Sequence, residues 1–180
     1  MRYVVLDCET TGFNKSRGRD VSDGHRIIEI ACVEVIGNVI TGKKFHRYVN
    51  PSMKIDPAAT RVHGITDADV KRELPFSRIV HDFLSFVADD VIVIHNAPFD
   101  ISFLDKEFRL LDEQDRPIGL KFKVRDTLEM ARSLFPYQKN RLDDLCTRFG
   151  VKGRDEKHGA LIDAIILAKV FLVLDQYVLY

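Results

Sequence analysis

The spacing of hydrophobic and polar positions changes along the chain, from a pattern typical of strands to one typical of helices. Residues 2–9 contain the apolar run "YVVL", which indicates a buried strand. Residues 25–49 contain two further apolar runs separated by Gly37 and Asn38, and a two-residue connection of this kind predicts a tight hairpin. The polar stretch at 14–24 is expected to be a loop. The first part of the chain therefore predicts three antiparallel strands.

From residue 76 onward the apolar positions recur mostly at helical intervals. The segment "FSRIVHDFLSFV" places apolar side chains at helical spacing, and Pro75 precedes its start. The run "VIVIH" predicts a short buried strand, and a helix is expected over 99–111. The remaining expected elements are a last strand at 122–127, helices near 127–135 and 141–149, and a strongly apolar helix over 158–174.

This order of elements predicts a mixed α/β layer fold. The three antiparallel strands would be extended by strand–helix units, with helices on both faces of the sheet. With 180 residues, 46% of them hydrophobic and 30% charged, the chain is expected to form a single globular domain over residues 1–180.

Charge, hydrophobicity and cysteine usage limit the binding partners and the cellular compartment that the sequence allows. Lys and Arg together number 27, as do Asp and Glu, so any attraction to a polyanion has to come from a local basic face. The N-terminal apolar run is too short for a signal peptide, and no stretch approaches the ~18 apolar residues that cross a membrane. Cys8, Cys32 and Cys146 are few and widely spaced, which indicates a reduced, cytoplasmic protein.

The first strand ends with a pair of acids in the stretch "VVLDCETTG". Asp7 and Glu9 are two residues apart in an extended strand, so both project to one face while Cys8 turns to the other. Two like charges about 4 Å apart repel by roughly 4 kcal/mol at an effective dielectric of about 20. A bound cation is the simplest way to offset that repulsion.

Two further acids and a histidine occur near the starts of later elements. Asp100 follows the "VIVIH" strand at a helix start, where alone it would be read as a complement to the helix dipole. Asp163 lies in the most apolar helix, where an unpaired charge is expensive, and His158 precedes it by five residues. Together with Asp7 and Glu9 these residues predict a two-metal hydrolase site, whose oxygen ligands suit Mg²⁺ or Mn²⁺ rather than zinc.

The stretches "DCETTG", "HNAPFD" and "HGALIDA" resemble the three motifs of the DEDD superfamily of exonucleases, in the branch whose general base is histidine. Further stretches, such as "HRIIEIACVEV", "DPAATRVHGIT" and "NRLDDLCTRFGV", extend the resemblance over nearly the whole chain, most closely to the proofreading epsilon subunits of bacterial DNA polymerase III. The resemblance implies a ribonuclease-H-like mixed five-stranded sheet with helices on both faces. It also implies a 3′→5′ exonuclease that uses two divalent cations and releases nucleoside 5′-monophosphates from DNA.

Carried over residue by residue, the resemblance assigns a role to each matching position. The implied metal ligands are Asp7, Glu9, Asp100 and Asp163, and the implied general base is His158. The implied contacts to the 3′-terminal nucleotide are Thr10, Thr11, Val62, His63, His95, Asn96 and Phe99. Without the resemblance, Val62 and Phe99 would be interpreted as core residues. Cys8 stands where an apolar residue or Thr is common, and because it faces away from the ions we expect no loss of activity.

The implied partners are a single-stranded 3′ end of DNA and the catalytic alpha and theta-type subunits of polymerase III, with no membrane. Two other functions stay open: an RNA-trimming exonuclease of the ribonuclease T or oligoribonuclease type, which uses the same ligands, and a non-catalytic interaction module. The long collinear match favours DNA, and the presence of the whole catalytic set argues against the module.

Epsilon subunits continue into a polymerase-binding tail, whereas this sequence ends after its last helix, so it is either truncated or works without that attachment.

Overall fold

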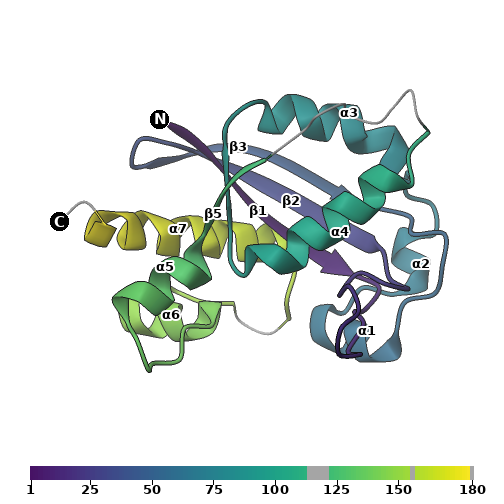
Figure 1. The fold of residues 1–180 in the computed structure, drawn as a ribbon. Helices are drawn as coiled ribbons and strands as arrows, with labels where there is room; N and C mark the ends of the chain where they lie inside the picture. The colour runs from purple at the N-terminus through teal and green to yellow at the C-terminus, as the bar shows by residue number, and fades with distance from the viewer. Residues whose placement is uncertain (113–121, 155–156, 179–180) are drawn as a thin grey trace.

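The computed structural model describes residues 1–112, 122–154 and 157–178 and contains a five-stranded sheet (Figure 1). Its strands are β1 (Arg2–Thr10), β2 (Ile27–Ile36), β3 (Val39–Tyr48), β4 (Val91–Ile94) and β5 (Lys123–Asp126). They lie in the order β3-β2-β1-β4-β5. The β3-β2-β1 part is antiparallel, whereas β4 runs parallel to both β1 and β5. The mixed sheet expected from the sequence is confirmed.

Helices cover both faces of this sheet. They are α1 (Pro57–His63), α2 (Asp67–Val70), α3 (Phe76–Val87), α4 (Ala97–Arg109), α5 (Thr127–Leu134), α6 (Leu142–Phe149) and α7 (Ala160–Val178). The helices α3 and α4 cover one face, and α7 covers the other with α5 and α6 packed against it (Figure 1). In the part of the chain that the structure describes, no helix combines the length and apolar character needed to cross a bilayer.

Each face of the sheet buries its own hydrophobic core. On the α3 and α4 face, Phe76, Phe83 and Phe103 are almost completely buried against residues of β1 and β2. On the α7 face, the ring of Phe171 packs edge-on against that of Tyr3, with the ring centroids 4.9 Å apart. The central strand β1 is therefore clamped from both sides, which holds the acids near its end in place.

The two short helices α1 and α2 are the elements that the hydrophobic pattern did not predict. Asp56 caps α1 by accepting a hydrogen bond from the amide of Ala58 at 2.7 Å, and Pro57 occupies its first turn. The helix ends at Gly64, whose φ of 79° lies in the left-handed region. Helices this short show little periodicity, so only these capping residues could have indicated α1 from the sequence.

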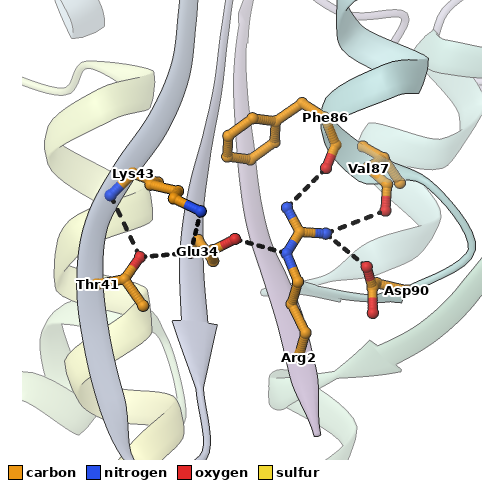
Figure 2. A network of polar contacts seen from close by, with 7 residues as sticks. All are labelled: Arg2, Glu34, Thr41, Lys43, Phe86, Val87 and Asp90. Atoms are coloured by element: carbon orange, nitrogen blue, oxygen red, sulfur yellow. Dashed lines mark hydrogen bonds and ion pairs between the residues drawn. The ribbon is translucent and has the colours of Figure 1, made fainter.

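Arg2 joins the start of β1 to the end of α3 (Figure 2). Its Nε donates to Glu34 at 2.6 Å, Nη1 to Asp90 at 2.5 Å, and Nη2 to the carbonyl of Phe86 at 2.8 Å. Thr41 donates to the second oxygen of Glu34 at 2.7 Å. Bonds from Arg2 and Thr41 hold the pKa of the buried Glu34 below its ordinary value. The carboxylate of Glu34 is thus paired on both oxygens.

We predict that Arg2→Met lowers the thermal denaturation midpoint more than Lys54→Met. Methionine keeps much of the aliphatic volume but removes the 2.6 Å pair with Glu34, so that only Lys43 remains near that carboxylate, at 3.9 Å. It also leaves the carbonyl of Phe86 at the end of α3 without a donor. Lys54 forms a 3.0 Å pair with Asp67, but its side chain is 89% exposed, and exposed pairs contribute little. Circular dichroism melts compare the variants, and equal shifts would contradict the role assigned to Arg2.

Candidate active site

The end of β1 and the first turns of α4 and α7 meet at one cavity of about 670 Å³. Its lining includes the four acids singled out in the sequence, together with the histidine: Asp7, Glu9, Asp100, Asp163 and His158. Asp7 and Glu9 lie two residues apart on β1 and therefore on the same face. The topology thus brings together carboxylates that are separated by more than a hundred residues in the chain.

Three of these side chains lie close enough to share one ion. A ligand atom from each of Glu9, His158 and Asp163 lies within 4.8 Å of the others. The Nδ1 atom of His158 is 3.3 Å from Oδ2 of Asp163. This cluster of oxygen and nitrogen donors fits a hard divalent cation.

Burial and mutual repulsion make ionisation of these acids unfavourable. Burial raises the pKa of Asp7 well above its ordinary value, and the nearby carboxylates of Asp100 and Asp163 raise it further. Burial also raises the pKa of Asp100 to about 7. It raises the pKa of Glu9 to about 8, with Asp163 as the next cause. A set of carboxyls that ionises this reluctantly is suited to a site where a cation compensates the charge.

Arg154 supplies positive charge to the same cluster. Its Nε donates to Oδ1 of Asp163 at 2.8 Å, and its Nη1 donates to Nε2 of His158 at 2.9 Å. Since a guanidinium only donates, Nε2 of His158 is the acceptor and the ring carries its hydrogen on Nδ1, facing Asp163. The sequence analysis missed Arg154. The only feature that could have indicated it is its position four residues before His158.

Glu29 of β2 fixes the start of α7 and was also missed. It lies opposite Glu9 in the antiparallel register and is 3% exposed. One oxygen accepts from the amide of Ala160 at 3.0 Å, and the other is 2.7 Å from Nε2 of His46. Glu29 therefore ties the α7 start, and with it His158, to the strand beside Glu9. An acid inside the apolar run "IIEIACVEVI" was the signal that could have found it.

Asp126 at the end of β5 fixes the turn that leads into α4. Its carboxylate accepts from the amides of Asn96 at 3.0 Å and Ala97 at 2.9 Å. Asn96 has a φ of 69°, in the left-handed region, so the turn is sharp. His95 and Asn96 line the same cavity as Asp100, and Nδ1 of His95 lies 2.9 Å from the hydroxyl of Thr127. The sequence analysis did not predict this role of Asp126.

A second cavity of about 310 Å³ adjoins the first on the α1 side. Glu9 and Phe99 line both cavities, while Val62 and His63 line the second. Val62 is 49% exposed and is therefore not a core residue. Nδ1 of buried His63 accepts from the amide of Ile65 at 3.0 Å, and its Nε2 lacks a hydrogen-bond partner among the described residues. Burial lowers the pKa of His63, and because its Nδ1 accepts a hydrogen bond, the ring hydrogen is on Nε2.

Thr10, Thr11 and Cys8 differ in whether they line the two cavities. Thr10 lines the second cavity, and its hydroxyl donates to the carbonyl of Gly12 at 2.9 Å. Thr11 is completely buried outside both cavities, and its hydroxyl accepts from the amide of Arg26 at 3.0 Å. Cys8 packs in the α3 and α4 core, as its place between Asp7 and Glu9 predicts, yet it also lines both cavities. It is therefore closer to the acids than the sequence reading expected.

Comparison with known proteins finds similarity over nearly the whole chain. The exonuclease family profile matches residues 4–171. The chain is 42% identical over 174 residues to the DNA polymerase III subunit epsilon of Buchnera aphidicola subsp. Schizaphis graminum, covering 96% of this chain and 74% of the relative. It is 44% identical over 175 residues to the subunit of that name from Rickettsia conorii, covering 97% and 74%. Among solved structures, exonuclease X in complex with 5′ overhanging duplex DNA superposes with a TM-score of 0.73 at 25% identity, covering 99% of this chain and 93% of that one.

We predict that, without divalent ions, the free energy of unfolding falls as pH rises between about 4.5 and 8. The pKa of Glu9 is about 8 in the folded protein and 4.5 ordinarily, so the folded state holds the proton longer and the stability is lost through this window. Glu9→Gln lacks the titrating group and is expected to lose less stability over the same range. Melting curves in EDTA from pH 5 to 9 measure both proteins. Parallel profiles would show that Glu9 does not titrate as described.

We also predict that Arg154→Met destabilises the metal-free protein by about 3 kcal/mol, because breaking a buried pair leaves a buried charge uncompensated. The paired side chains are 10% exposed for Arg154 and 5% for Asp163. Arg47→Met is the control, since its 3.9 Å pair with Asp82 joins side chains that are 48% and 70% exposed. Chemical denaturation in EDTA gives the two values, and Mn²⁺ should restore more stability to Arg154→Met than to the control. A loss no larger than that of the control would rule out a compensating role for Arg154.

Proposed function

The chain belongs to the exonuclease family and, within it, to the epsilon subunits of bacterial DNA polymerase III, and on this premise we propose that it proofreads DNA by removing nucleotides from single-stranded 3′ ends. It is a 3′→5′ exonuclease with the ribonuclease-H-like fold of its relatives. The observation that carries the proposal is the gathering of Asp7, Glu9, Asp100, Asp163 and His158 around one cavity.

The family depends on divalent cations, and the site is suited to them. We infer that Asp7, Glu9, Asp100 and Asp163 hold two ions, either Mg²⁺ or Mn²⁺, because oxygen ligands favour these metals. Such ions lower the pKa of water and neutralise charge on the phosphate and the leaving oxygen. The raised pKa values of Asp7, Glu9 and Asp100 support this inference, since these carboxyls need a compensating charge to ionise together.

His158 is the proposed general base. Its Nε2 lone pair is the acceptor in the tautomer described above, and its Nδ1–H faces Asp163, which holds the ring in orientation. Arg154 has to release Nε2 before the ring can take a proton from the attacking water. Histidine is the residue that most often serves as a general base in enzymes.

The 3′-terminal nucleotide is proposed to occupy the smaller cavity. Val62 and Phe99 offer apolar surface for an unpaired base, and His63 offers an unpaired ring N–H. Thr10 borders the cavity, whereas Thr11 is proposed to support the turn through its bond to Arg26. His95 and Asn96 lie on the side of the larger cavity, where the scissile phosphate and the next nucleotide would lie. None of these contacts reads a particular base, as proofreading requires.

The proposed setting is the cytoplasmic replication machinery, with the alpha and theta-type subunits of polymerase III as partners. The support for this is the similarity to epsilon subunits over 96% of the chain. A pull-down with purified alpha and theta subunits tests it directly.

We predict that Asp7→Asn abolishes detectable nucleotide release and that His158→Ala lowers kcat by about 10²–10⁴-fold, the range of a lost general base. Asp82→Asn, an exposed acid whose side chain is 70% exposed, is the control and should be fully active. The assay follows 5′-labelled single-stranded DNA with Mg²⁺, beside an RNA of the same sequence.

Each result of this assay decides one part of the proposal. Activity surviving in both Asp7→Asn and His158→Ala would refute the catalytic assignment. Faster cleavage of the RNA would instead identify an exoribonuclease of the same superfamily. Activity that persists in EDTA would exclude the divalent cations.

A further inference from the structure

The turn between α5 and α6 carries a tyrosine in an unusual conformation. Tyr137 has a φ of 65°, in the left-handed region that favours glycine, and its side chain is fully exposed. A non-glycine residue is held in this region only where the surrounding structure enforces it, and such residues cluster at ligand contacts and active sites. Because the ring is fully exposed, packing against the residues that the structure describes does not explain the choice of tyrosine at this position.

The surrounding residues make the turn rigid. Asn140 donates to the carbonyls of Phe135 and Gln138, both at 3.1 Å. Arg148 of α6 donates to Oδ1 of Asn140 and to the carbonyl of Lys139, both at 2.8 Å, and its guanidinium lies 4.6 Å from the ring centroid of Phe135. The turn is therefore fixed from α6, and Tyr137 is presented to solvent on a preorganised backbone.

The residues that follow Tyr137 form one wall of the catalytic cavity. Gln138, Lys139, Asn140 and Arg141 all line it, together with Arg132 of α5. The three cationic side chains of this wall are exposed, and no carboxylate of the described turn lines the cavity. The acids Asp7, Glu9, Asp100 and Asp163 form the other part of the lining. A chain with zero net charge thus places a basic wall beside its acidic centre.

The arrangement of the two cavities gives the path of a bound strand, and this step rests on the proposed function. With the terminal nucleotide on the α1 side and the scissile phosphate at Glu9, the rest of the strand has to leave across the larger cavity. It then passes the wall formed by residues 138–141, in the connection from α5 to α6 (Figure 1). Tyr137 directly precedes Gln138, the first residue of this wall, in the chain.

We propose that Tyr137 and Lys139 form a binding site for the unpaired strand on the 5′ side of the scissile phosphate. The phenol ring stacks on an exposed base, and the ammonium of Lys139 pairs with a backbone phosphate. Stacking on an aromatic ring accepts every base, because each base has a π-face. The cations of the wall complement the phosphates of a nucleic-acid strand.

The test separates this site from the metal centre by the length of the substrate. The full chain is assayed on a single-stranded DNA decamer and on the p-nitrophenyl ester of thymidine 5′-monophosphate, which has no upstream nucleotide. Tyr137→Gly is expected to raise the ratio of KM for the decamer to KM for the ester by about 5- to 150-fold, the equivalent of one lost stacking contact. Its melting temperature should be equal or higher, since glycine suits the backbone there. Tyr137→Phe, which keeps the ring, should restore the wild-type ratio.

The contribution of the Lys139 charge is measured separately, through the salt dependence of DNA binding. The salt dependence of decamer binding in EDTA, followed by fluorescence anisotropy, should weaken in Lys139→Gln by about 0.7 in logarithmic slope, the value for one phosphate contact on a single strand. An unchanged KM ratio in Tyr137→Gly would overturn the site. An equal rise of KM on both substrates would also overturn it, because the effect would then lie at the metal centre. Failure of the wild type to cleave either substrate would instead refute the proposed function.

Discussion

The burial of four neighbouring carboxylates in one cavity is the constraint on which the site depends. Asp7, Glu9, Asp100 and Asp163 share a cavity that burial makes unfavourable for charge, and the raised pKa values of Asp7, Glu9 and Asp100 express that cost. Arg154 offsets part of it through Asp163. Such a site favours the binding of cations, because a divalent ion relieves the repulsion between carboxylates that the fold holds close together.

The strand order explains how acids so far apart in the chain meet. β1 and β4 are parallel neighbours, so their carboxyl ends lie at the same edge of the sheet. Asp7 and Glu9 come at the end of β1, and Asp100 follows β4 in the first turn of α4. Glu29 and Asp126 then act as braces, one holding the start of α7 and the other the turn before α4. Both side chains are carboxylates that accept hydrogen bonds from backbone amides. The residues that support the site therefore add further acidic groups around the four carboxylates.

The segregation of charge links this geometry to the substrate. A zero net charge conceals an acidic centre and, on the α5–α6 side, a wall carrying Arg132, Lys139 and Arg141. The acids are suited to metal ions, whereas the basic wall is suited to the phosphates that those ions would otherwise have to attract alone. In the proposed function, the exposed surface of Val62 and Phe99 in the smaller cavity is the contact for an unpaired base.

The amino-acid sequence determined the features that are encoded locally. The strand before Asp7, the helix 76–87 and the apolar helix bearing Asp163 were predictable, because each segment's own periodicity reports its burial. The acids and His158 were identified because a charge in an apolar segment is conspicuous, and the family motifs matched them.

The tertiary structure decided the contacts between distant segments. The bond from Ala160 to Glu29 spans 131 residues, and no local pattern records it. Arg154 could be assigned to the site only once the loop before α7 was placed beside Asp163, and Thr11 could be excluded from the cavities only once its burial was known. The short helices α1 and α2 have too few turns for a periodic signal. Sequence periodicity reports how deeply a segment is buried, whereas its neighbours depend on how the whole chain packs.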